Sequence, residues 1–301
     1  MDRINYNHLR YFWAVAHDGN LTRTAERLNL SQSALSVQIR KLEDRLGVKL
    51  FEKRGRGLAL TEAGRIALDH ADAIFAAGRD LEAALSGDGA VRRVLRVGAL
   101  ATLSRNFQLS VLRPLIGRAD VEVVLRSADL GTLLAGLEAH RLDLVLLNAP
   151  PMRDAGTPWI VHELDSQPVS LVGTPARVAG RTDLAALVAS EPLILPTVET
   201  PLRGAIDAVL ARLGVRPQVT AEVDDMAMIR LLARADDGLA VVPPIVVEDE
   251  LASGRLVEAH RFDDVVERFC AVTLERRYPN PLVAEVLGAL EADRARRDLT
   301  S

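Results

Sequence analysis

The chain has 301 residues, of which 49% are apolar and only 4% aromatic, with 37 Lys and Arg against 41 Asp and Glu. This length suits two domains, and the apolar content suits cores built from Leu, Val, Ala and Ile rather than a disordered chain. No run of 18 apolar residues occurs and residues 1–5 lack the apolar run of a secretory signal, so we expect neither a membrane span nor export. The single cysteine, Cys270, lies in an apolar run that predicts a buried strand. One buried thiol forms no internal disulfide, which fits a cytoplasmic protein.

Positive charge is concentrated at the beginning of the chain. Residues 1–65 hold 12 Lys and Arg against 7 Asp and Glu, which leaves 25 against 34 for the remaining residues. All three lysines, Lys41, Lys49 and Lys53, fall in the basic segment. A small basic part on an acidic body indicates one domain that contacts nucleic acid phosphates and a larger body that avoids them.

The first 60 residues predict a small helical domain with a hairpin. Asn20 and Ser31 stand where the N-caps of two helices belong, and Gly47 stands where a helix ends with a positive φ. Two short apolar runs around a basic, glycine-containing tip predict the hairpin. The expected elements are helices over residues 7–17, 21–28 and 31–46 and a hairpin over residues 50–60. We interpret residues 1–61 as a winged helix-turn-helix domain.

A long helix is predicted over residues 62–85, with Thr61 as its cap. One narrow apolar stripe runs along it in steps of four and three, which is the pattern of a coiled-coil seam. We interpret residues 62–89 as a linker and dimerisation helix that ends at the boundary Ser86–Gly89; packing of the stripe on its own chain is the alternative. The stripe consists of Ala67, Ala71, Ile74, Gly78, Leu81 and Leu85.

Strands alternate with helices beyond this boundary. Such alternation predicts parallel sheets joined by crossover helices, and residues 90–301 are long enough for two α/β lobes. We place lobe 1 at about 90–161 and 267–301 and lobe 2 at about 162–266, with the chain crossing at 159–164 and returning at 261–267. The expected strands are 94–100, 121–126, 142–147, 169–172, 192–195, 219–223, 239–242 and 268–274, with helices from about 103 and over 130–139, 201–213 and 226–235.

The helix over residues 31–46 is the candidate for reading DNA, because the second helix of a helix-turn-helix fits the major groove. Gln suits a bidentate pair with adenine, and a valine suits the methyl group of thymine. Basic residues on the hairpin tip suit phosphates or the minor groove, although a solvated surface is the alternative. The candidate DNA contacts are Thr22, Gln32, Ser33, Ser36, Val37 and Arg40 on the helices and Lys53, Arg54 and Arg56 on the hairpin.

Candidate effector contacts follow strands, because ligands of open α/β sheets bind beyond the carboxyl ends of strands. Thr102 and Ser104 offer hydroxyl groups and free amides at a helix start, which suits an anion or a polar group, with ordinary helix capping as the alternative. Asn148 follows the third strand and is a further candidate. Asp224 and Asp225 precede a helix, and we expect them to cap it.

Several blocks of the chain resemble the LysR-type transcriptional regulators in residue type, spacing and order. Val37 is a departure, because many members carry arginine there, so base reading is expected to depend less on arginine. The blocks are His8–Phe12, Leu21–Leu28, Ser31–Ser36, Ile39–Glu43, Leu46–Phe51 and Thr61–Gly64, followed by the looser Leu95–Gly98, His140–Leu144 and Asp237–Pro243.

This resemblance covers nearly the whole chain and implies a multidomain α+β and α/β fold: a winged helix-turn-helix, a long linker helix and a two-lobed domain like periplasmic binding proteins. It implies a homodimer or homotetramer on an inverted-repeat operator in double-stranded DNA, and contact with RNA polymerase if the protein is an activator. A small molecule or an ion would bind between the lobes. Family positions in this cleft match Thr102, Leu130, Thr197 and Pro243. The resemblance favours an activator, because most members of the family activate transcription. The sequence leaves open whether the protein is an activator or a repressor, and whether it is a dimer or a tetramer.

Within the family, the motifs Tyr6–Trp13, Arg54–Leu58 and Val223–Asp225 resemble the NhaR branch, whose namesake regulates sodium/proton antiporter expression. This resemblance suggests a response to sodium. An organic anion as effector of a repressor or autoregulator is the alternative.

Two other classes of protein fit the sequence less well. An enzyme is not indicated, since the chain has no glycine-rich phosphate loop, no Gly-x-Ser-x-Gly motif and no His/Cys metal spacing among its six histidines. We therefore expect no cofactor and no metal. A free solute-binding protein would share the two-lobed body but not the basic helix-turn-helix.

Overall fold

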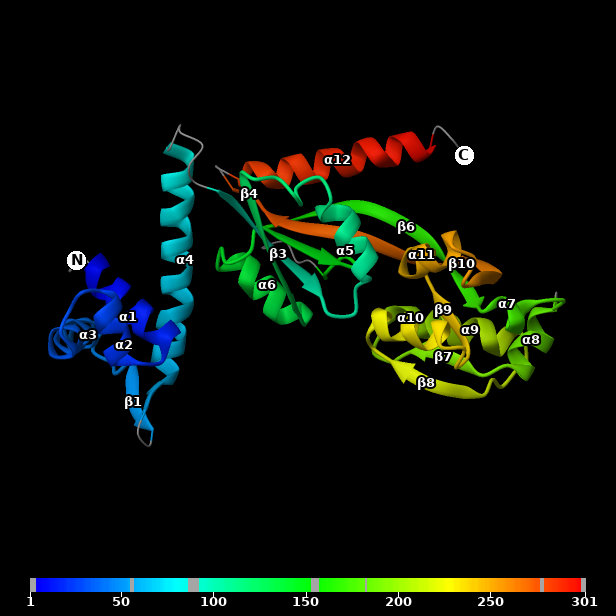
Figure 1. Ribbon diagram of the computed structural model, residues 1–301, viewed down its shortest axis with the longest axis horizontal. Helices are drawn as coiled ribbons and strands as arrows, with labels where there is room; N and C mark the ends of the chain where they lie inside the picture. Colours follow the sequence, from blue (N-terminus) through cyan, green and yellow to red (C-terminus); the bar gives the residue numbers. More distant parts are fainter. Residues whose placement is uncertain are drawn as a thin grey trace. The chain divides into compact units, whose positions relative to one another are not determined.

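A computed structural model describes residues 4–54, 57–85, 92–152, 157–181, 183–276 and 279–298. It consists of two compact units, Met1–Val91 with Ala139–Arg141, and Arg92–Glu138 with Leu142–Ser301 (Figure 1). The predicted wing-tip residue Arg56 and the predicted boundary Ser86–Gly89 lie outside the described residues. None of the helices in the described ranges has the length and apolar content that a membrane span requires.

The first unit has the predicted order of three helices, a hairpin and a long helix. The caps lie where the sequence places them: the side chain of Asn20 accepts the amide of Arg23 at 3.1 Å, and that of Ser31 accepts the amide of Ala34 at 3.1 Å. Gly47 ends the third helix with φ of 73°. The elements are α1 (Tyr6–Asp18), α2 (Leu21–Arg27), α3 (Gln32–Leu46), β1 (Phe51–Arg54), β2 (Gly57–Leu60) and α4 (Glu62–Leu85).

A small apolar core holds α1, α3, the hairpin and the first half of α4 together. Phe12, Leu42 and Leu50 are fully buried and pack with Ala71 and Phe75 of α4. Because burial of apolar surface is the main favourable term in folding, this cluster fixes α3 on α1 and holds α4 as part of the same unit.

The strands of the second unit form one mixed sheet in the order β4-β3-β5-β10-β6-β9-β7-β8. The prediction of parallel sheets is correct for β4-β3-β5 and for β9-β7-β8, but it is wrong for the two strands between them. The strands are β3 (Arg93–Leu100), β4 (Val121–Ala128), β5 (Leu144–Leu147), β6 (Trp159–Gly173), β7 (Leu193–Pro196), β8 (Val219–Val223), β9 (Leu239–Val242) and β10 (Val257–Leu274).

The crossing and return segments expected at 159–164 and 261–267 are parts of two long strands, β6 and β10, which pair with each other antiparallel. Their pairing is interrupted between Phe262 and Val266, where the register shifts. β10 also pairs antiparallel with β5, and β6 with β9. The polypeptide therefore passes between the lobes as sheet rather than as loop.

These pairings fix the direction of every strand. β5 runs the same way as β6, because each is antiparallel to β10, whereas β9 runs against β6. The carboxyl ends of β3, β4 and β5 and those of β7, β8 and β9 consequently point toward the same region, the middle of β6 and β10. We call this region the strand crossing.

Helices cover both lobes, and Figure 1 shows them along the sheet. In lobe 1, α5 and α12 share one apolar cluster with β3, while α6 covers the opposite face. The helix over 281–298 had no counterpart among the predicted elements. The helices are α5 (Arg105–Leu112), α6 (Leu130–Glu138), α7 (Pro175–Val178), α8 (Leu184–Ser190), α9 (Pro201–Arg212), α10 (Met226–Arg234), the 3-10 turn η1 (Pro244–Val247), α11 (Glu248–Ala252) and α12 (Pro281–Asp298).

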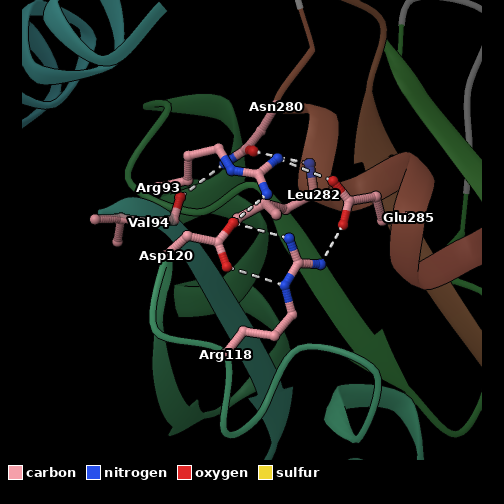
Figure 2. A network of polar contacts seen from close by, with 7 residues as sticks. All are labelled: Arg93, Val94, Arg118, Asp120, Asn280, Leu282 and Glu285. Atoms are coloured by element: carbon pink, nitrogen blue, oxygen red, sulfur yellow. Dashed lines mark hydrogen bonds and ion pairs between the residues drawn. The ribbon is translucent and has the colours of Figure 1, made fainter. Parts of the chain in front are cut away.

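A polar network fixes α12 to the amino ends of β3 and β4 (Figure 2). Asp120 binds Arg93 at 2.6 Å and Arg118 at 2.9 Å, and both guanidinium groups also reach Glu285 of α12. Arg118 and Arg93 hold the pKa of Asp120 well below its usual range. Because this network lies at the opposite strand ends from the strand crossing, we assign it to the attachment of α12 and not to ligand binding.

Candidate functional site: a DNA-reading helix and the strand crossing

Helix α3 presents one buried and one open face. Leu35 and Leu42 are fully buried and Ile39 is 5% exposed, so this side of α3 belongs to the core. The turn before α3 is tight, with Asn29 at φ of 54°. The sequence thus positions α3 as the second helix of a helix-turn-helix with its outer side free.

Most of the predicted DNA contacts lie on this open side. Val37 is 46% exposed, which is unusual for a valine and leaves an apolar group between polar neighbours. Ser36 is half-buried, and the hydroxyl of Ser33 lies 3.0 Å from that of Ser31. Thr22, Gln32, Ser33, Arg40 and Lys53 are exposed, Arg54 lies on β1, and Arg56 is outside the described residues.

Glu43 organises the wing, a role that sequence reasoning missed. Its buried carboxylate accepts the amides of Leu50 at 2.9 Å and Phe51 at 3.3 Å and binds Lys49 at 2.7 Å. Burial alone raises the pKa of Glu43, but these hydrogen bonds outweigh it and leave the pKa lowered. A glutamate at the end of a helix, six residues before a lysine, is the only signal in the sequence, and it does not distinguish this role from a surface pair.

The apolar stripe predicted for α4 is buried within the first unit in one part and exposed in another, so the whole stripe is not one open seam; its use in a dimer stays a prediction. Ala71 is fully buried against the first unit's own core, as the alternative predicted. Ile66, Ile74 and Leu81, at 56%, 41% and 60% exposure, form an uncovered apolar face. Ile66 was not among the predicted stripe residues, and the side chain of Leu85 is not described.

Asp72 joins α4 to α1 on the side of α4 away from this face. Its Oδ1 accepts the indole N–H of Trp13 at 2.7 Å and lies 2.8 Å from Nε2 of His17. The aromatic ring of Trp13 also packs against Phe75. These contacts bind α4 rigidly to the helix-turn-helix within the first unit.

The predicted effector contacts of lobe 1 lie at the carboxyl ends of adjacent parallel strands. Thr102 and Ser104 follow β3, Leu130 follows β4, and Asn148 follows β5. Ser104 is buried and its hydroxyl accepts the amide of Phe107 at 3.4 Å, so it acts as the helix cap that the alternative described. Leu130 is 40% exposed at the start of α6.

The predicted contacts of lobe 2 lie at the corresponding strand ends. Thr197 follows β7; its amide donates to Val223 and its carbonyl accepts the hydroxyl of Thr200. Pro243 is buried between β9 and η1. Asp225 caps α10 through the amide of Ala227 at 2.8 Å, as expected.

Glu267 at the strand crossing was not among the predicted site residues, although it ends the predicted return segment. It is 6% exposed, and Nδ2 of Asn148 donates to its Oε1 at 3.1 Å. Burial raises the pKa of Glu267 to about 7. Its detection from sequence would need the pairing of residues 119 positions apart.

Comparison with known proteins agrees with this arrangement. Residues 6–65 match the model of the bacterial regulatory helix-turn-helix protein, lysR family, and residues 88–295 match the LysR substrate binding domain. The chain belongs to the LysR family of transcriptional regulators. Both halves of the LysR assignment made from the sequence are thereby confirmed.

Relatives span almost the full chain. The transcriptional activator protein NhaR of Escherichia coli K12 is 26% identical over 287 residues, 95% of each chain. The E. coli regulator YdcI is 33% identical over 267 residues, covering 85% of this chain and 84% of its own. The RuBisCO operon transcriptional regulator of Allochromatium vinosum is 29% identical over 259 residues, 84% of each. All are transcriptional regulators and not enzymes.

Solved structures of LysR regulators share the fold. Full-length CbnR complexed with its target DNA has a TM-score of 0.67 at 22% identity, covering 96% of this chain and 99% of its own. A full-length OxyR variant of Pseudomonas aeruginosa has a TM-score of 0.65 at 23% identity, covering 96% of this chain and 95% of its own. The two-domain LysR architecture is therefore confirmed, while the individual site residues stay predictions.

No group of three or more His, Cys, Asp or Glu suited to a metal ion occurs within the described ranges. Cys270 is 2% exposed in β10, and burial raises the pKa of its thiol to about 11. It is the buried strand residue that the sequence predicted, and it is unsuited to nucleophilic chemistry.

Proposed function

We propose that this LysR regulator binds an inverted-repeat operator through α3 and acts in the bacterial cytoplasm. The observation that carries the proposal is the open side of α3, where Ser33 and the exposed Val37 lie away from the buried apolar side. Gln32 is exposed in the first turn of the same helix. A side chain set of amide, hydroxyl and methyl groups matches base edges in the major groove. The relative CbnR, whose structure contains its target DNA, supports the same use of this domain.

The hairpin supplies contacts that hold the protein on DNA without reading it. Lys53 is exposed on β1, and Glu43 accepts the amide of Phe51, the first residue of this strand. A cation at a wing of this kind suits phosphate oxygens, and phosphate contacts give affinity and orientation rather than specificity. Arg54 and Arg56 are assigned the same role from the sequence.

The exposed apolar face of α4 supports a dimer. Ile66, Ile74 and Leu81 recur at helical spacing on one helix, and much of each side chain is open to solvent. Two copies of such a helix cover each other's stripe, and a two-fold dimer matches an inverted repeat. A homotetramer requires a second interface on the effector-binding unit.

The effector is proposed to bind at the strand crossing. Thr102, Ser104, Leu130 and Asn148 in lobe 1 and Thr197 and Pro243 in lobe 2 follow strands that point to this region. Binding there can change the relation of the two lobes, provided that the effector binds one arrangement more tightly than the other.

The finer assignment is an activator that responds to sodium and contacts RNA polymerase. It is supported by 26% identity over 95% of the chain to an activator, NhaR, and by the motifs shared with that branch. An organic-anion-responsive repressor is the second candidate, supported by the hydroxyl of Thr102 beside a helix start, a suitable place for an anion.

A protection footprint on the intergenic DNA beside the gene tests the function. Wild-type protein should protect a long tract that contains an inverted repeat, and Gln218→Ala, an exposed glutamine of the second unit, should protect the same tract. Titration in NaCl and in KCl at equal ionic strength separates a sodium response from general salt screening. If no tract is protected at low salt, and genomic pull-down recovers no specific site, this chain does not read DNA through α3.

A further inference from the structure

A buried carboxyl group lies at the strand crossing with one hydrogen bond. Within the described chain, Nδ2 of Asn148 is the donor to Glu267, and the second carboxyl oxygen receives no hydrogen bond. Glu267 is 6% exposed on β10, one residue after the register shift that ends at Val266. An ionised carboxylate needs several donors when it leaves water, so this position favours the protonated form.

Among the described residues of the surrounding elements, no cation is directed at Glu267. On α5, Arg105 donates to Gln108 and Ser127, and on α10, Arg230 binds Asn106 and Asp249. Nearby on the crossing strands, Asp165 of β6 accepts from Gln167, and Arg268 of β10 is exposed. Other charged groups near this position are acidic residues that pair with arginines, Asp263 with Arg261 and Asp264 with Arg212. α11 adds Glu248, Asp249 and Glu250, of which the last two pair with Arg230. The charge balance around Glu267 therefore offers an ionised carboxylate no counter-ion.

The same place joins the two lobes through η1. Gln167 is the cross-strand partner of Glu267, and cross-strand pairs share a face of the sheet. Its Oε1 accepts the amide of Ile245 in η1 at 3.1 Å. Nδ2 of Asn106 in α5 lies 3.5 Å from the carbonyl oxygen of Val246 in the same turn. Hydrogen bonds and the burial of Val246 and Val247 in the core of lobe 2 thus hold η1 beside the strand that pairs with Glu267.

We propose that Glu267 is a proton-binding site of the effector-binding unit, and that release of this proton loosens η1 from the strand crossing. The neutral carboxyl tolerates its buried position between Asn148 and Gln167, whereas the carboxylate requires water or a ligand that donates hydrogen bonds. The ligand of this site is then the proton itself. When the proton is released, a hydrogen-bond donor such as an ammonium or hydroxyl group can bind the carboxylate in its place. The site lies within the second unit and does not depend on DNA binding.

The sign of the effect follows from the direction of the pKa change. Because the folded protein raises the pKa of Glu267 from 4.5 to about 7, the folded state holds a proton that the unfolded state has released over this pH range. Stability consequently falls as pH rises from about 4.5 to about 7, and it levels off above.

Thermal unfolding of the full chain tests the site. The midpoint temperature of the wild-type protein should decrease as the pH rises from 5.5 to 8. Glu267→Gln keeps the planar shape of the side chain but does not titrate, so it should lose most of this slope. The difference between the two proteins should change by about 5 °C across the range. Glu163→Gln, at an exposed carboxylate on β6, is the matched control and should keep the wild-type slope. Equal slopes for wild type and Glu267→Gln would overturn the proton site.

Hydrogen exchange of the Ile245 amide tests the link to η1. Expressed relative to the unfolded-peptide rate at each pH, its protection should drop at least about threefold between pH 6 and pH 8 in the wild type and stay constant in Glu267→Gln. Asn148→Ala removes the hydrogen bond that lowers the pKa of Glu267, so the transition should move to higher pH. This variant provides a second test if Glu267→Gln folds poorly. Protection that does not change with pH in any of the three proteins would show that η1 does not respond to Glu267.

Discussion

The carboxylate of Glu43 accepts the backbone amide of Leu50 at 2.9 Å, which ties the end of α3 to the first residue before the wing. One buried side chain therefore controls both the helix assigned to the DNA bases and the strand assigned to the phosphates. Its amide partners lie seven and eight residues away, so the contact sets the geometry of the turn between them.

Glu43→Gln should destabilise the first unit by about 1–3 kcal/mol, because the buried amides and Lys49 lose a charged acceptor. The pKa of Glu43 is lowered in the fold, so its stabilisation is present above the unfolded value near 4.5 and disappears as pH falls through the folded value. Urea unfolding at pH 7 and at pH 3.5 measures this, and the gap between variant and wild type should shrink at acid pH. Asp44→Asn, at the exposed neighbour, should show neither change. A gap that is equal at both pH values would contradict the role of the carboxylate.

Gly98→Ala should destabilise the second unit by about 1–3 kcal/mol, because overpacking forces neighbours apart. An added Cβ would lie 2.6 Å from Cδ2 of Leu133 and 2.7 Å from Cδ1 of Leu142, where α6 approaches β3. Gly204→Ala in α9 meets nothing within 4 Å and should instead stabilise by about 0.5–1 kcal/mol, as alanine does in helices. Calorimetry of the two variants compares them directly; a stable Gly98→Ala protein would mean that α6 moves away at little cost.

Replacement of Ile74 by arginine should disrupt the proposed dimer, because it places a charge on the exposed apolar face of α4. Sedimentation velocity should show a dissociation constant raised by at least about tenfold, which corresponds to about 1.4 kcal/mol. Ile116→Arg, at an exposed isoleucine after α5, is the control. An unchanged dissociation constant for Ile74→Arg would place the interface elsewhere.

Gln32→Ala and Lys53→Ala should weaken DNA binding in different ways. Loss of a base contact by Gln32→Ala should cost about 1–3 kcal/mol at one operator position and leave nonspecific binding unchanged. Lys53→Ala should weaken binding to all sequences and reduce the slope of log K against log salt by about one. Titrations on operator and scrambled DNA at several salt concentrations, with Arg255→Ala of the second unit as control, separate the two effects. A uniform loss from Gln32→Ala would show that another side of α3 faces the bases.

The sequence predicted the first unit well because its signals are local. Asn20, Ser31 and Thr61 each cap a helix that begins at the next residue, so a few neighbouring residues specify each boundary. The strands of both lobes were found for a similar reason, since runs such as Leu144–Leu147 are buried throughout.

The missed features depend on residues far apart in the chain. β6 and β10 carry consecutive polar residues where they cross, Asp165–Gln167 and Asp263–Asp264, and such runs resemble loops until the two strands are paired. The stripe of α4 could not be divided from sequence, because the residues that cover Ala71 lie on α1 and α3. The contact of Asn148 with Glu267 required knowledge of the β5–β10 pairing.

The passage of the chain through β6 and β10 also limits how the protein is made. Leu147 in β5 finds its neighbour Cys270 only after the whole of lobe 2 has been synthesised. The first unit, built from local contacts, can fold while the ribosome is still translating the rest. Lobe 1 instead has an unpaired sheet edge at β5 until β10 has been synthesised and has left the ribosome. We therefore expect nascent chains truncated before residue 257 to bind chaperones through lobe 1, although their helix-turn-helix is already folded.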